Sequence, residues 1–121
     1  MNNKRLGTEF EREVCDKLSE AGWWVHFLSP NNAGAQPFDI IAVKKGVALA
    51  MDCKTSCTNV FASNRLEDNQ IYAFEKWLEC GNAMPLIVIK YNDNCYFVPF
   101  EYLRDNKKVD LNLWINADVI F

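Results

Sequence analysis

The sequence predicts an α/β fold in which a mixed β-sheet is flanked by helices. Apolar residues recur at the helical period in the first quarter of the chain and again around Phe74. Short apolar runs bounded by turn residues lie between and after these two segments, as is typical of buried strands. The expected order of elements is α-β-β-β-α-β-β, which favours a mixed sheet over an all-parallel one.

The first helix is expected to begin at Thr8 and to end near Gly22. Glu11 lies three residues after Thr8, which is the spacing of a capping box at a helix N-terminus. Apolar residues from Phe10 to Leu18 recur at the helical period, and glycine commonly follows the end of a helix. The sequence therefore predicts an amphipathic helix in this segment.

A short apolar strand over residues 23–28 is expected after the first helix. The polar stretch 29–37 predicts a loop, because it is rich in proline, asparagine and glycine. Residues 38–43 and 47–54 then form the two strands of a predicted hairpin, with its turn at Gly46.

The rest of the chain predicts a second helix, a strand pair and a short tail. Residues 55–64 are rich in threonine, serine and asparagine and predict a loop. The second helix carries Phe74 on its apolar face and is expected to end near Gly81. The elements expected after it are strands at 85–91, 95–99 and 119–121 and a short helix at 101–104.

Length and composition indicate a single folded domain over residues 1–121. No apolar run approaches the roughly 20 residues that cross a membrane. The first residues lack the apolar stretch of a signal peptide, and the five cysteines include no Cys-x-x-Cys pair. We therefore expect a cytoplasmic protein of a bacterial, archaeal or phage-infected cell, with reduced thiols. The net charge of −3 argues against a broad electrostatic grip on nucleic acid.

Two carboxylates and a lysine are expected to meet at one end of the hairpin. Asp39 opens its first strand, and Asp52 and Lys54 end the second. Side chains alternate along a strand, so Asp52 and Lys54 face one side of the sheet and Cys53 faces the other. Carboxylate oxygens are hard donors that suit Mg²⁺, and an ammonium group beside them suits hydrolysis of a phosphodiester.

Each of these residues also has a purely structural interpretation. Asp-x-Lys is a common tripeptide at solvated strand ends, although here it follows an apolar run, where charged residues are unusual. Glu11 could serve only as the capping partner of Thr8. Gln70, at the start of the second helix, could serve only as a cap, and His26 is interpreted as a structural residue.

With these elements placed, the sequence resembles the PD-(D/E)xK nuclease superfamily, and within it the Holliday junction resolvases of archaeal and phage type. The resemblance runs from about residue 7 to residue 99 and implies a restriction-endonuclease-like fold and a metal-dependent endodeoxyribonuclease. The motifs that carry it are residues 7–13 of the first helix, Pro37-Phe38-Asp39, Asp52-Cys53-Lys54 and Gln70.

The resemblance implies a role for five residues. Glu11, Asp39 and Asp52 correspond to the metal-holding acids, with Mg²⁺ as the expected ion and Mn²⁺ as a possible substitute. Lys54 corresponds to the lysine that positions the attacking water, and Gln70 to a polar residue near the scissile phosphate. Asp52 stands where the resolvases more often carry glutamate, so its carboxylate reaches less far toward the metal.

DNA, in branched or four-way form, is the expected partner, bound by a homodimer. The resemblance places Ser29 and Asn31 near the cut strand. An exposed tryptophan, either Trp23 or Trp24, and the tail after Phe100 are expected at the dimer interface. The basic residues expected to contact DNA are Arg12, Lys44, Lys45 and Arg65.

Two alternatives stay open at the level of sequence. One keeps the fold and changes the substrate, as in restriction, repair or phage-replication nucleases that act on flaps, ends or duplex. The other is a non-catalytic DNA-binding or interaction protein of the same fold. The acidic isoelectric point of about 5.1 favours the non-catalytic alternative, whereas the complete set of three acids and a lysine argues against it.

Overall fold

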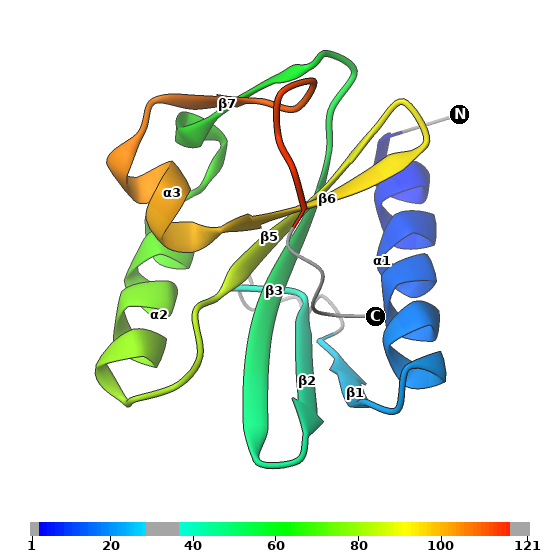
Figure 1. The fold of residues 1–121 in the computed structure, drawn as a ribbon, viewed down its shortest axis with the longest axis vertical. Helices are drawn as coiled ribbons and strands as arrows, with labels where there is room; N and C mark the ends of the chain where they lie inside the picture. Colours follow the sequence, from blue (N-terminus) through cyan, green and yellow to red (C-terminus); the bar gives the residue numbers. More distant parts are fainter. Residues whose placement is uncertain (1–2, 29–36, 117–121) are drawn as a thin grey trace.

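The computed structural model describes residues 3–28 and 37–116. Its centre is a five-stranded mixed sheet with the strand order β1-β2-β3-β5-β6 (Figure 1). The predicted α/β class is confirmed. The elements are α1 (Asn3–Glu20), β1 (Trp24–Phe27), β2 (Ile40–Lys44), β3 (Val47–Thr55), β4 (Val60–Ala62), the 3-10 helix η1 (Ser63–Arg65), α2 (Asp68–Glu79), β5 (Leu86–Tyr91), β6 (Asn94–Pro99), α3 (Phe100–Asp105) and β7 (Lys108–Asp110).

The β2–β3 hairpin turns where the sequence predicted it. Lys45 and Gly46 form a two-residue loop, with φ values of 48° and 80°. Two central residues with positive φ match the twist of the flanking strands, and glycine adopts this conformation at no steric cost. The strands are antiparallel, with Lys44 paired to Val47 and Ile40 to Met51. This tight turn fixes the register of every residue farther along the hairpin.

Helices cover both faces of the sheet (Figure 1). Helix α1 lies on one face, and α2 and α3 lie on the other. The crossover through α2 makes β3 and β5 a parallel pair, while the other neighbours in the sheet are antiparallel. The core under α1 consists of Phe10, Val14, Leu18, Ile40, Ala42, Leu49, Met51 and Val88. The core under α2 and α3 includes Phe38, Ala50, Phe61, Phe74, Ile87, Ile89, Val98, Phe100 and Leu103.

Helix α1 begins earlier than the capping pattern predicted. It starts at Asn3, so Thr8 lies inside the helix and the prediction of a capping box between Thr8 and Glu11 is wrong. The residues before Thr8 contain no proline, and Gly7 costs only about 1 kcal/mol inside a helix, so the helix continues through it. The end near Gly22 is correct, since this glycine follows the helix with a φ of 93°.

The predicted loop at 55–64 is also wrong in its second half. It contains β4 and η1, and β4 pairs with β7 in a separate two-stranded sheet. Phe61 of β4 and Val109 of β7 are paired and buried. Each strand has only three residues and its partner lies far away in the sequence, so neither gives a local signal. The strand predicted at 119–121 lies outside the described residues.

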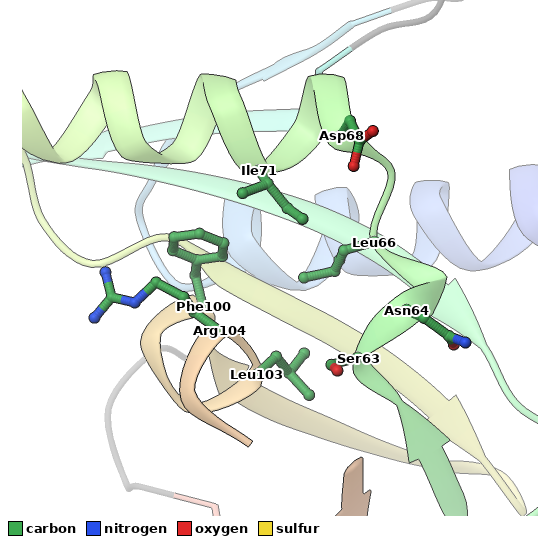
Figure 2. A pocket seen from close by; sticks show the side chains of 8 residues that line it. All are labelled: Ser63, Asn64, Leu66, Asp68, Ile71, Phe100, Leu103 and Arg104. Atoms are coloured by element: carbon green, nitrogen blue, oxygen red, sulfur yellow. The ribbon is translucent and has the colours of Figure 1, made fainter. Parts of the chain in front are cut away.

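A pocket of about 320 Å³ lies between η1, α2 and α3 (Figure 2). Figure 2 shows Leu66, Ile71 and Leu103 pointing toward one another, with the guanidinium of Arg104 directed away from them. The predicted site residues are not among those that line this pocket. No helix in the described part of the chain is long and apolar enough to cross a membrane.

Candidate active site

Asp39 and Asp52 come together at the end of the β2–β3 hairpin that is opposite its turn. The ladder ends with Ile40 paired to Met51, and the Asp39 N–H, just before β2, also donates to the Met51 carbonyl oxygen at 3.0 Å. Asp39 therefore lies at the end of the ladder, with its side chain close to that of Asp52. Asp39 Oδ2 accepts a 2.8 Å hydrogen bond from the Cys53 N–H. The backbone of β3 therefore fixes the position of this carboxylate.

Asp52 is buried beside Lys54. It is only 2% exposed, and strand alternation directs it and Lys54 to the α2 face, while Cys53 packs against the core under α1. Lys54 Nζ lies 3.2 Å from Asp52 Oδ2. That oxygen nevertheless has no aligned hydrogen-bond donor among the described residues. A buried carboxylate oxygen in this state is suited to a further cationic ligand.

Burial raises the pKa of two carboxyl groups at this site. The pKa of Asp52 rises from 3.8 to about 8, first because the group is buried and then because Asp39 is close, while Lys54 lowers it. The pKa of Glu11, on α1, rises from 4.5 to about 7 through burial and then through Asp39. Asp39 thus acts on both groups. Asp52 and Glu11 therefore ionise with difficulty beside Asp39 unless a positive charge is placed among them.

Gln70 links α2 to this cluster. Its side-chain Oε1 accepts a hydrogen bond from the Glu67 N–H at 3.0 Å and another from Lys54 Nζ at 3.4 Å. Glu67 is the N-cap of α2, and its side chain in turn accepts from the Gln70 N–H. Gln70 is therefore both a cap and a contact of the lysine. Glutamate is uncommon as an N-cap, so the sequence gives only a weak signal for Glu67 in this role, although Glu67-x-x-Gln70 has capping-box spacing.

The described residues do not contain a preassembled metal cage. No set of three or more carboxylate, imidazole or thiol side chains among them is placed to hold one ion. The donor chemistry nevertheless fits a hard divalent cation, because Asp39 and Asp52 are adjacent and Asp52 Oδ2 lacks an aligned donor. The residues thus match the expected ion in type, and Glu11 approaches the pair from α1.

Comparison with known proteins identifies the family. The family model described as archaeal Holliday junction resolvase (Hjc) matches residues 2–119. The chain belongs to the Hjc family. It is 31% identical over 117 residues to the crossover junction endodeoxyribonuclease Hjc of Methanocaldococcus jannaschii, a match that covers 96% of this chain and 83% of that protein.

Solved structures share the fold of this Hjc-family chain. The 1.6 Å structure of the Holliday junction resolvase Hjc from Archaeoglobus fulgidus superposes with a TM-score of 0.66 at 19% identity, covering 87% of each chain. A bacterial homing endonuclease superposes with a TM-score of 0.60 at 11% identity, covering 98% of this chain and 81% of its own. The predicted restriction-endonuclease-like fold is therefore confirmed.

The basic residues predicted to contact DNA do not form one cluster. Arg65 Nη1 donates to the Thr55 carbonyl oxygen at 2.8 Å, which holds the arginine one residue beyond Lys54 on the sheet. Arg12 is exposed on α1, next to Glu11. Arg65 is thus held close to Lys54, whereas Arg12 is placed only as the residue after Glu11 on the helix. Two other predicted contacts lie outside the described residues, namely Ser29 and Asn31.

The two lysines of the hairpin turn lie at the other end of the sheet. Lys44 is five residues from Asp39, roughly 17 Å along an extended strand. Its ammonium donates to the Ala21 carbonyl oxygen at 2.6 Å and lies over the Trp23 ring. Lys44 thus attaches the hairpin to the end of α1, while Lys45 is exposed in the turn.

Proposed function

We propose that this Hjc-family protein is a divalent-metal-dependent endodeoxyribonuclease that hydrolyses strands of a four-way DNA junction. The observation that supports it most is the pairing of Asp39 with the buried Asp52, with Lys54 Nζ 3.2 Å from Asp52 Oδ2. An acid pair in which one carboxylate is buried destabilises a fold that has no ligand, so the pairing of Asp39 with the buried Asp52 favours a functional role.

Asp39 and Asp52 are proposed to hold Mg²⁺, or Mn²⁺ in its place, with Glu11 contributing from α1 directly or through water. When bound, the ion supplies Lewis-acid polarisation of the scissile phosphate and lowers the pKa of a water molecule. The hydrogen bond from the Cys53 N–H keeps Asp39 oriented before the ion arrives. The high pKa of Asp52 and of Glu11 means that ion binding releases protons at neutral pH.

Lys54 is proposed to orient the attacking water and to offset the negative charge that grows on the phosphate. The water oxygen bonds to phosphorus as the bond to the 3′-oxygen breaks, leaving a 5′-phosphate and a 3′-hydroxyl. Gln70 holds the lysine from α2 at 3.4 Å, and the buried Asp52 holds it from β3. Fixing the ammonium before the reaction removes the need for it to reorganise during the reaction.

A homodimer is proposed to bind the junction. A four-way junction presents two symmetry-related strands to be cut, and a twofold dimer presents two equivalent sites. Sedimentation of the protein at micromolar concentration, alone and with junction, measures this state. We expect a dimer in both samples, and a monomer that stays monomeric on the junction would contradict the proposal.

The direct test of the function is cleavage of a labelled four-way junction and of linear duplex of the same sequence. With Mg²⁺ we expect nicks in junction strands, little cutting of duplex, and no cutting after the metal is chelated. Equal cutting of both substrates would favour a nuclease of broader substrate range. Absence of cutting with Mg²⁺ and with Mn²⁺ would exclude the proposed activity.

Replacing Lys54 by methionine is expected to lower the cleavage rate by about 10²- to 10³-fold, because it removes the ammonium and keeps the packing of the chain. Single-turnover cleavage of the junction measures the effect. Lys90→Met is the matched control. Lys90 lies on the neighbouring strand β5 and pairs with Glu13 on the α1 face of the sheet. The cleavage rate of the Lys90→Met variant should therefore stay close to that of the wild type. Equal losses of cleavage rate in the two variants would show that Lys54 contributes only through the overall positive charge of the protein.

A further inference from the structure

Trp24 is a large apolar side chain in an unusual position. It lies on the edge strand β1 and is 62% exposed, whereas its neighbour Trp23 packs against the core under α1. The ring of Trp24 stacks on the ring of the exposed His26, with the centroids 6.1 Å apart and an angle of 8° between the planes. These two parallel, exposed rings present aromatic surface at the edge of the sheet, and we call them the Trp24–His26 pair.

The strand register places the Trp24–His26 pair on the same sheet face as Asp52. Trp24 is opposite Val43, and His26 is opposite Ile41. Ile41 is paired with Ala50, and Asp52 follows Ala50 by two residues on β3, so alternation puts Trp24, His26 and Asp52 on one face. From strand spacings, His26 is roughly 8 Å and Trp24 roughly 14 Å from Asp39. The pair is therefore continuous with the candidate active site.

This part of the sheet face is not covered by the helices. The core under α2 and α3 draws mainly on β3, β5 and β6, and on the β1–β2 side of the sheet it reaches only as far as Leu28 and Ile41, which pack at its margin. Figure 1 shows α2 and α3 on the side of the sheet that is away from β1. An exposed tryptophan contributes little to the stability of the fold, and it suits a surface that binds a partner.

We propose that the Trp24–His26 pair is a DNA-binding surface that stacks on an unpaired base of the strand that enters the active site. The inference rests on the proposed function, since it needs DNA at Asp39 and Asp52. An aromatic ring stacks on any base, because each base has a π face. The indole N–H and the imidazole can also donate to sugar or phosphate oxygens.

The charge of the protein supports this choice of ligand. The net charge is −3, and the lysines of the hairpin turn lie away from the acids, so phosphate neutralisation alone provides limited affinity. Stacking needs no net charge. An acidic protein that binds branched DNA therefore gains affinity from an aromatic contact. Close to the active site, such a contact is within reach of the unpaired bases of a distorted junction.

The test uses the full-length protein with Asp52→Asn, which removes cleavage and allows binding to be measured alone. In this background, Trp24→Ala should weaken junction binding about 5- to 100-fold by fluorescence anisotropy. Trp24→Phe should restore most of the affinity, because it keeps a stacking ring. Leu113→Ala removes another exposed apolar side chain, which lies outside the sheet, and should leave the affinity unchanged. Thermal unfolding checks that each variant is folded.

A junction carrying 2-aminopurine near the cut reports stacking directly. Its fluorescence should be quenched by the Asp52→Asn protein and by its Trp24→Phe derivative, but not by the Trp24→Ala derivative. Affinity within twofold of the parent for Trp24→Ala, or unchanged quenching, would overturn the inference while the proposed cleavage still stands. Loss of binding together with dissociation into monomers would identify Trp24 as a subunit contact instead. If the wild type neither binds nor cuts junctions, the proposed function fails and the inference fails with it.

Discussion

Asp52→Asn is expected to lower junction cleavage on the order of 10³-fold and to leave junction binding equal or tighter. Asparagine has almost the same shape, so the packing of β3 is kept, but it removes the charge that a divalent ion requires. Removing a negative charge beside a phosphate also weakens repulsion of the DNA. Single-turnover cleavage in Mg²⁺ and anisotropy without cleavage separate the two effects.

The control for this variant is Asp105→Asn, an exposed aspartate at the end of α3. It changes the net charge by the same amount and should cut at the wild-type rate. Cleavage by Asp52→Asn within tenfold of the wild type would remove Asp52 from the metal-binding set. A parallel loss of junction binding would instead assign this aspartate a structural role.

The hairpin and its acids could be predicted because their determinants are local. Gly46 fixes the turn, the turn fixes the register, and the register places Asp39 at the end of the ladder, close to Asp52. Lys54 then follows from the alternation of side chains along β3. A two-residue turn and the alternation of side chains along the strands are sufficient to place these acids and the lysine, so the sequence predicts the centre of the site well.

The links between distant segments could not be predicted in the same way. The pairing of β4 with β7 joins two strands of three residues each that are far apart in the sequence. The contact of Gln70 with Lys54 depends on where α2 docks on the sheet, and the sequence shows only that this glutamine begins a helix. Such contacts are set by packing of the whole domain, for which a single sequence gives no periodic signal.

The exposure of one tryptophan is an intermediate case. Alternation along β1 predicts that Trp23 and Trp24 face opposite sides, but it does not say which face is covered. The structure answers this, because Trp23 packs against the core under α1, whereas Trp24 is exposed among the described residues. Composition gives the net charge but not its distribution, because only the fold shows that Asp52 is buried while Arg12 and Lys45 are exposed.

The same substitution, Asp52→Asn, is expected to stabilise the metal-free protein. The pKa of Asp52 is about 8 in the folded state against 3.8 for the free side chain, so the folded state favours the protonated form. Stability from this group is therefore complete below pH 4 and is lost as the pH rises through about 8. Asparagine cannot ionise, so the variant avoids this loss of stability at high pH. The loss of the ion pair with Lys54 offsets part of the gain in stability.

Thermal unfolding in the presence of a chelator, followed by circular dichroism at pH 5, 7 and 9, measures this effect. We expect the difference in Tm to be smallest at pH 5 and to grow with pH, so that the variant melts about 5 °C or more above the wild type at pH 9. Mg²⁺ should raise the Tm of the wild type and narrow the difference, because an ion that binds only the folded state stabilises it. If the variant melts at or below the wild-type temperature at pH 9, the claim that the charge of Asp52 destabilises the metal-free fold is wrong. If the substitution both stabilises the protein and inactivates it, the buried acid is retained for the reaction and not for the fold.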